Sequence, residues 1–332
     1  MNRLPLICII LAFLFASSDG LAQDLMQKLT SRRVGSDGGA IEATFAATPA
    51  ADVHNQNTTF SAQRFTLSGI VPFYNSNINE VGLGAFITQG KAESAAILPT
   101  TLDPMPEDYT KISVGPYYKH IFKNKWMFAL NVQIGSSSDE PFSGINVMDI
   151  GGNVVLNIPA GKKSSWVAFI NYSSNRDFWR NIPIPGFGYA FDAEWARGMA
   201  GAPTFYLHIL HKKPINFIVR YFPIITTYAE MGYDISPPLR IATCFAWHDD
   251  HFWRKDRQVE RDQMFFVRKE IGGYVSIRPE KFLTLKFTGG VGFDRYIFEA
   301  QSVIRDKGYN RVDLDSSPFV NVSLSATIGG PK

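Results

Sequence analysis

The sequence predicts an all-β chain that forms an antiparallel up-and-down transmembrane β-barrel of about 12–14 strands, with short periplasmic turns and longer extracellular loops. Three observations predict this fold class. The chain begins with the pattern of a secretory signal, and long segments of alternating apolar and polar residues recur behind it. Short turns and longer links alternate between those segments.

The N-terminus has the pattern of a cleaved signal peptide. Arg3 supplies a positive charge, residues 4–16 form an apolar run, and Gly20-Leu21-Ala22 places small residues where a signal peptidase cuts. The run is shorter than the roughly 20 apolar residues that a transmembrane helix needs. Export would divide the chain into four parts, which are a signal peptide (1–22), a short periplasmic segment (23–40), the barrel (41–328) and a C-terminal tail (329–332).

Composition agrees with a membrane barrel. Aromatic residues make up 14% of the chain and charged residues 19%, whereas globular chains average about 25% charged residues. The net charge of +3 is mild and gives no reason to expect a nucleic-acid partner. Signal cleavage would leave Cys244 as the single cysteine, so no intrachain disulfide can form. A soluble secreted β-sandwich would share this composition, so the choice between the two depends on strand length.

Strand length favours the membrane. In residues 319–328, Val, Val, Leu, Ala and Ile alternate with Asn, Ser, Ser and Thr. The same alternation occurs over 126–135, 148–158 and 283–294. These segments approach the 9–11 residues of a tilted membrane-spanning strand, whereas strands of globular sheets average about 5–6 residues. The apolar faces are therefore expected to contact lipid, and the small polar faces to line the lumen.

The number of strands is less well defined by the sequence. About fifteen segments have the alternating pattern, but a barrel with both ends in the periplasm needs an even number. Segments shorten within 188–236, where Pro203, Pro214 and Pro223 interrupt them. We expect the error in the count to lie in that region.

The connections alternate in length. Short polar turns are expected at 75–79, 122–125, 159–164, 236–238 and 278–281. Longer links are expected at 90–108, 136–145, 174–187, 249–262 and 299–316. This asymmetry is typical of bacterial outer-membrane barrels. The proline-containing link 90–108 is expected to cap or line the extracellular entrance.

Three segments carry a resemblance to a known family. They are FTLSGIVPFYNSN (65–77), NIPIPGFGYAF (181–191) and GGVGFDRYIFE (289–299). The chain resembles a family of uncharacterised outer-membrane β-barrels that is known only as a domain of unknown function. The resemblance implies the barrel fold and a location in the Gram-negative outer membrane, and it transfers no catalytic residues. One departure is the ending IGGPK, because many such proteins end in an aromatic residue that the assembly machinery recognises.

Charged residues on the polar faces are candidates for the lumen. The nine candidates are Arg64, Lys111, Lys119, Arg220, Arg240, Glu270, Arg278, Lys286 and Asp294. Such charges either pair with one another in a closed network or line a water-filled channel and set its ion preference. Seven of the nine are basic, which favours anions. Asp294 and its neighbour Arg295 cannot both face inward, so one of them is expected at a rim or bulge.

One loop concentrates residues of chemical interest. His248, Asp250 and His251 are types that bind divalent ions, but positions i and i+3 face opposite sides of a strand, so a joint site requires the loop to turn. A solvated, charged extracellular loop is the simpler interpretation. We predict no metal site and no cofactor.

Catalytic residues are not expected either. A lipase-type site would need the serines of 171–175 together with His208 or His211, and a protease-type site would use Asp249-Asp250 with His251. Nothing in the sequence brings these groups together.

Three functions fit a barrel of this kind. The first is a narrow pore or channel for small solutes with a basic-lined lumen. The second is a closed structural or adhesive barrel that binds partners through its extracellular loops. The third is a barrel enzyme that acts on lipid or peptide at the rim. The sequence favours the pore, and the partners it predicts are outer-membrane lipid, the assembly machinery and a small solute.

Overall fold

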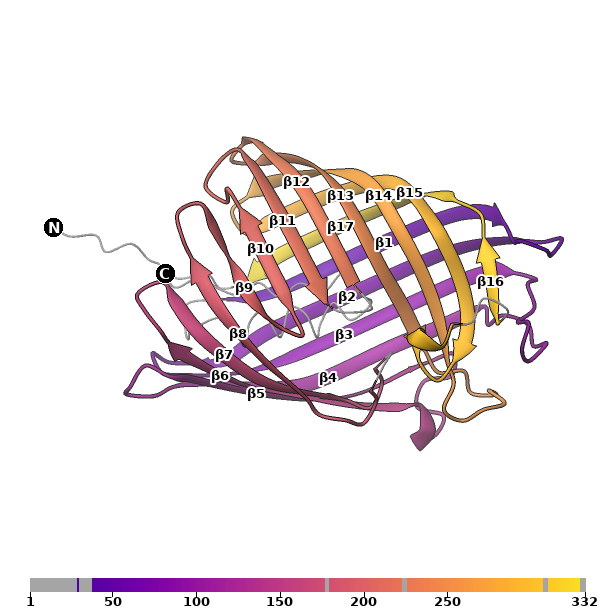
Figure 1. Ribbon diagram of the computed structural model, residues 1–332, viewed down its shortest axis with the longest axis horizontal. Helices are drawn as coiled ribbons and strands as arrows, with labels where there is room; N and C mark the ends of the chain where they lie inside the picture. Colours follow the sequence, from indigo (N-terminus) through magenta and orange to yellow (C-terminus); the bar gives the residue numbers. More distant parts are fainter. Residues whose placement is uncertain (1–28, 30–37, 177–178, 223–225, 307–309, 329–332) are drawn as a thin grey trace.

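Antiparallel pairing runs around the whole of the computed structural model (Figure 1). The structure describes residues 29, 38–176, 179–222, 226–306 and 310–328. The predicted signal peptide, most of the predicted periplasmic segment and the C-terminal tail lie outside the described residues. In the described chain, no helix has both the length and the apolar character needed to cross a membrane.

The strands succeed one another with short connections. In chain order they are β1 (Gly39–Asp52), β2 (Thr59–Asn75), β3 (Asn79–Ser94), β4 (Asp108–Ile121), β5 (Met127–Ser138), β6 (Met148–Pro159), β7 (Ser164–Ser173), β8 (Ile184–Asp192), β9 (Ala196–Ala202), β10 (Phe205–Ile209), β11 (Ile215–Phe222), β12 (Thr226–Ser236), β13 (Leu239–Phe252), β14 (Gln263–Glu280), β15 (Leu283–Ala300), β16 (Arg311–Leu314) and β17 (Ser317–Ile328). Two 3-10 helices, η1 (Ile145–Val147) and η2 (Val303–Arg305), lie in the connections.

The sheet closes on itself. Each strand from β1 to β15 pairs with the next, β15 pairs with β17, and β17 pairs with β1. Strand β16 pairs with the end of β15 that β17 leaves uncovered, so β16 and β17 share one place in the cylinder. Of the seventeen strands described, sixteen positions therefore form a closed antiparallel barrel. The prediction of this fold class is confirmed.

The predicted strand number of 12–14 is wrong. The segment that the sequence pattern missed is β9, which lies inside the region 188–236 where the error was expected. Its residues, ARGMAGA, include none of the β-branched or aromatic types that favour strands. Pairing with β8 on one side and β10 on the other holds this segment extended, which no local pattern could indicate.

The exterior of the barrel is apolar. Side chains of alternate residues, such as Leu83 and Ile87 in β3 or Val132 and Ile134 in β5, point outward and are exposed. Ile271 in β14 is 58% exposed. An apolar surface that surrounds a closed cylinder is unfavourable in water and is the expected surface of a barrel in a lipid bilayer. The alternation predicted from the sequence is confirmed.

The two ends of the barrel differ as predicted. Gly39 pairs with Ile328, so the first and last barrel strands begin and end at the same rim, which we take as periplasmic. The predicted short turns lie at that rim, and the long connections lie at the opposite end, which we take as extracellular (Figure 1). The short β9–β10 link also lies at the extracellular end. The wall is lowest at β9, β10 and β11, which have 7, 5 and 8 residues, whereas β2 has 17 and β14 has 18.

Apolar side chains fill the extracellular end of the lumen. This apolar cap consists of Val53, Phe60, Ala92, Ala96, Leu98, Met105, Phe252, Met264, Ile297, Val312 and Leu314. Three of its members, Ala96, Leu98 and Met105, come from the connection between β3 and β4, in agreement with the capping role expected for that loop. A backbone hydrogen bond of 2.9 Å from Trp253 N to Ser137 O joins the ends of β13 and β5 across the mouth. Both features bring opposite walls of the barrel together at this end.

Candidate functional site

Ionisable side chains and one tyrosine, from five strands, meet in the lumen against the inner side of the apolar cap. We call this group the charged layer; its members are Arg64 on β2, Tyr109 and Lys111 on β4, His248 and Asp250 on β13, Arg268 and Glu270 on β14, and Arg295 on β15. Each lies within a few residues of a cap residue on its own strand or on the adjoining loop. The layer therefore lies between the apolar cap and the rest of the lumen.

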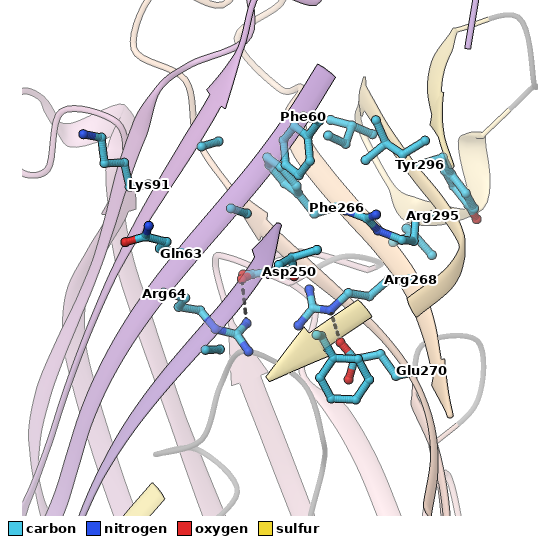
Figure 2. Close-up of a pocket in the computed structure, with 18 of the residues that line it drawn as sticks. Phe60, Gln63, Arg64, Lys91, Asp250, Phe266, Arg268, Glu270, Arg295 and Tyr296 are labelled. Carbon is cyan, nitrogen blue, oxygen red and sulfur yellow. Dashed lines mark hydrogen bonds and ion pairs between the residues drawn. The ribbon is translucent and has the colours of Figure 1, made fainter. Parts of the chain in front are cut away.

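Asp250 ties opposite walls of the barrel together. Its carboxylate accepts a hydrogen bond of 2.7 Å from the Tyr109 hydroxyl and another from Lys111 Nζ. It accepts a third, of 3.2 Å, from Arg64 Nη1 (Figure 2). β13 is not a neighbour of β2 or β4 in the sheet, so these contacts cross the lumen. Asp250 is 2% exposed. Burial of this carboxylate is compensated by two cations and one hydroxyl donor.

Tyr109 reaches Asp250 because the neighbouring strand has a glycine at the contact. Gly90 on β3 pairs with Tyr109, and a Cβ atom at Gly90 would lie 2.1 Å from Tyr109 Cε1. The ring therefore lies over the glycine, where it stacks on Phe252 with a centroid distance of 4.6 Å and an interplanar angle of 7°. A small residue at position 90 is needed for this arrangement.

A second ion pair lies beside the first. Arg268 Nε donates to Glu270 Oε1 at 2.8 Å, and His248 Nε2 lies 3.4 Å from Glu270 Oε2. Arg268 and Glu270 are two residues apart on β14 and so share its inward face. His248 pairs directly with Arg268 in the β13–β14 ladder.

Arg295 enters the layer through a bulge. The β14–β15 register shifts between Val267 and Lys269, and Asp294 has φ 46°, in the left-handed region that Asp tolerates better than most residues. The bulge turns Arg295 inward. Asp294 departs from the inward orientation predicted for it: it is exposed and forms an ion pair with the outward-facing Lys269.

Arg295 differs from the other cations of the layer in its partners. Its Nη1 donates to the backbone oxygen of Asp315 at 2.9 Å, and its guanidinium carbon lies 5.9 Å from the centroid of the Phe60 ring. Within the described part of the chain, no carboxylate lies at ion-pair distance from it, although it is only 6% exposed.

A pocket with a cavity volume of about 80 Å³ lies among these residues. Arg64, Asp250, Arg268, Glu270 and Arg295 line one part of it, as Figure 2 shows. The other part has an apolar lining that includes Phe60, Phe266, Ile297, Leu314 and Phe319. The pocket therefore combines charged groups with an apolar wall.

Most of the other lumen candidates lie nearer the periplasmic end. Lys119 is buried. Arg240 forms an ion pair of 2.6 Å with Glu230, Arg220 lies over the Tyr228 ring at 4.9 Å, and Lys286 lies over the Tyr274 ring at 3.9 Å. These residues form a second polar group, separate from the charged layer. Arg278 is exposed near the last residues of β14, at the periplasmic rim.

The prediction from sequence missed several inward acids and several inward arginines. Glu80, Asp192, Glu230 and Asp250 are buried charged residues on inward faces, and Arg268 and Arg295 were also missed. Glu80 lies on the opposite face of β3 from the outward-facing Leu83, so the alternation of the strand could have identified it as inward-facing. The ratio of basic to acidic residues in the whole lumen is therefore lower than the sequence predicts. In the charged layer, the cations Arg64, Lys111, Arg268 and Arg295 still outnumber the carboxylates Asp250 and Glu270.

The metal candidates do not converge. His248 and Asp250 point into the lumen, whereas His251 lies on the other face of β13, with Nδ1 3.2 Å from Asp249 Oδ2. A search of the residues that the structure describes finds no group of three His, Cys, Asp or Glu side chains that could hold a metal ion.

The catalytic candidates are also apart. Residues 171–175 lie at and just beyond the extracellular end of β7, whereas His208 and His211 lie near the periplasmic turn after β10. His208 Nε2 lies 3.3 Å from Asn216 Oδ1. Burial and the nearby Arg197 lower the pKa of His211 in that turn. The structure thus brings no serine of 171–175 to either histidine.

The β3–β4 loop is tied down at the mouth. Arg254, in the β13–β14 connection, donates to Asp103 Oδ2 at 2.9 Å and to Glu299 Oε2 at 3.1 Å. The hydrogen bond from Arg254 lowers the pKa of Asp103, so this carboxylate stays ionised in mildly acidic solution. One arginine therefore links the capping loop to the barrel wall.

Comparison with known proteins adds only distant likenesses. No family model matches the chain, and no curated protein matches it. Among solved structures, an outer membrane channel from Pseudomonas putida F1 aligns with a TM-score of 0.38 at 9% identity, over 89% of this chain and 96% of that one. The P. putida toluene transporter TodX aligns with a TM-score of 0.39 at 10% identity, over 89% and 91%. The β domain of the Bordetella autotransporter BrkA aligns with a TM-score of 0.32 at 8% identity, over 87% and 99%.

Likenesses this weak carry no argument about what the chain does. The fold rests on the closed strand pairing and the apolar exterior. The chain is a closed antiparallel β-barrel with an apolar exterior.

Proposed function

We propose that this barrel is a narrow channel of the Gram-negative outer membrane that passes small solutes and favours anions. The observation that carries the proposal is the surplus of cations in the charged layer, where four basic side chains face two carboxylates beside a lumen pocket. A ring of like charge at a constriction raises the local concentration of counter-ions and sets ion preference. Solutes on the way through the lumen would have to pass this layer.

The packing of the apolar cap across this end of the lumen supports a channel that conducts only when the capping loop moves. Leu98 and Met105 are buried in the apolar cap, and the Arg254–Asp103 contact holds their loop in place. An apolar constriction excludes water and ions until it widens. We infer that the β3–β4 loop gates the channel.

The matched pair Arg268 and Lys269 tests the proposal. These adjacent residues on β14 carry the same charge, but Arg268 faces the lumen pocket and Lys269 faces outward. The purified protein should show discrete conductance steps in planar bilayers, with a reversal potential in a KCl gradient that indicates chloride preference. Arg268→Gln should move that potential toward zero, and Lys269→Gln should leave it unchanged.

Two results would contradict the channel. One is the absence of steps at high voltage both in the wild-type protein and in a variant that lacks residues 96–105. The other is an equal effect of the two substitutions, which would mean that the lumen position of Arg268 has no bearing on ion preference.

A further inference from the structure

Arg295 is a buried cation that lacks a carboxylate partner among the described residues. A charge that is removed from water is normally paired, because desolvation is costly unless an opposite charge or several hydrogen bonds compensate it. The other guanidinium groups at the pocket have such partners: Arg64 contacts Asp250, and Arg268 contacts Glu270. One positive charge at this pocket is therefore left for a group that the chain itself does not supply.

The pocket presents Arg295 together with an apolar surface. Phe60 and Phe266 lie beside it with their ring centroids 6.0 Å apart, and Ile297 and Phe319 extend the same wall. In Figure 2 the two rings lie on one side of the pocket, and Arg64 and Asp250 lie on the other. A ligand that uses both parts must carry a charged end and a compact apolar body.

The side chains that line the pocket determine which ligand charge it can bind. A guanidinium group binds a carboxylate with two parallel hydrogen bonds, and Arg295 has donors left beyond the one that the Asp315 backbone receives. Asp250 and Glu270 also border the pocket, so a dianion such as phosphate would meet repulsion that a monoanion meets less strongly. A small hydrated anion would leave the aromatic wall unused. The cavity volume is about 80 Å³, so the apolar body of the ligand has to be compact.

We propose that this pocket binds a small monocarboxylate with a compact apolar body, of the size of an aromatic carboxylate, whose carboxylate pairs with Arg295 and whose body packs on Phe60 and Phe266. The proposal names a substrate class for the lumen and in that respect rests on the proposed channel function. Binding itself can be measured without conduction.

The first experiment is a ligand series on the full-length protein in detergent, measured by isothermal titration calorimetry. The probes are benzoate, benzyl alcohol, acetate and inorganic phosphate. Benzoate should bind, whereas benzyl alcohol lacks the charge and acetate lacks the apolar body. Benzyl alcohol and acetate should each bind at least about tenfold more weakly than benzoate, because one lacks the ion pair with Arg295 and the other lacks the apolar contact. Phosphate should also bind at least about tenfold more weakly, because it lacks the apolar contact and is repelled by the carboxylates of the pocket. Equal binding of benzoate and acetate, or of benzoate and phosphate, would overturn the proposal.

The second experiment locates the site. Arg295→Gln should weaken benzoate binding by roughly tenfold to a hundredfold, as expected for loss of charge-assisted hydrogen bonds, while Lys269→Gln should bind benzoate like the wild type. Unchanged affinity in Arg295→Gln would place the ligand elsewhere and overturn the proposal. Should that variant not fold, Phe266→Leu provides the second measurement: it should weaken benzoate more than acetate, and an equal effect on both would also contradict the site.

Conductance separates this inference from the channel function. Benzoate binding that depends on Arg295, in a protein that never conducts, would retain the site and remove the channel. Chloride-selective conductance that benzoate does not block, in a protein that does not bind benzoate, would retain the channel and remove the site.

Discussion

Asp250 offers the most direct test of how the barrel is held together across its lumen. The Asp250→Ala substitution removes a carboxylate that is 2% exposed and that accepts hydrogen bonds from Arg64, Tyr109 and Lys111. Removing one member of a buried ion pair typically costs about 3–5 kcal/mol, because the remaining charge stays desolvated without its partner. We expect a loss of that size in the free energy of unfolding, because Lys111 is as deeply buried as Asp250.

The assay is urea unfolding of the refolded protein in detergent, monitored by tryptophan fluorescence. Glu140→Ala is the matched control, because Glu140 and its partner Lys255 are both about half exposed. Exposed pairs contribute about 0–1 kcal/mol, so the control should change stability little. The double variant Asp250→Ala with Lys111→Met removes one of the uncompensated cations and should recover part of the loss. A loss below about 1 kcal/mol in Asp250→Ala, or no recovery in the double variant, would refute the reasoning.

Three further predictions address the site, the gate and the exterior. Gly90→Ala should destabilise the barrel by about 1–3 kcal/mol in the same unfolding assay, because its Cβ would displace the Tyr109 ring; wild-type stability would contradict the close contact. Asp103→Asn should increase both channel opening in bilayers and protease cleavage of the β3–β4 loop, since it removes the charge that Arg254 holds. The pKa of Asp103 is lowered, so its contribution is present above the usual carboxyl pKa and is lost only as the pH falls through the lowered value; loop cleavage by an added protease should therefore be constant between about pH 5 and pH 8. Ile271→Arg places a charge on the lipid-facing side and should cost about 2–4 kcal/mol in lipid vesicles if that position lies near the bilayer midplane; no loss would place this face outside the membrane.

Much of the site could be predicted from the alternation of inward-facing and outward-facing residues along each strand. Arg64, Lys111 and Glu270 were expected in the lumen from alternation alone, and the structure places them in the charged layer. Alternation works there because a strand that is apolar on one face leaves only one orientation for each side chain. It failed at Asp294, where a bulge inserts one residue and reverses the parity of the residues beyond it. The conflict between Asp294 and Arg295 was visible in the sequence, but the side that each residue takes was not.

Local sequence patterns could not predict a short strand that is held in place mainly by the strands on either side of it. β9 has small residues and no clear alternation, and it exists as a strand because β8 and β10 both pair with it. Hydrogen bonding to a strand on each side outweighs the weak strand propensity of these residues, because strand propensity depends strongly on context. The same region contains the lowest part of the barrel wall.

The sequence by itself determined the class of the molecule. The period-2 pattern, the segment length and the placement of turns together require strands with one apolar and one polar face. Such strands are stable in a bilayer only as a closed cylinder. The tertiary structure decided what meets inside that cylinder. Asp250 finds Arg64 and Lys111 across the lumen, and Arg295 turns toward Phe60, because barrel closure brings strands together that are far apart in the chain. Local alternation states which face a residue takes, but the partner on the opposite wall depends on the strand number and on the stagger between strands, which emerge only when the sheet closes.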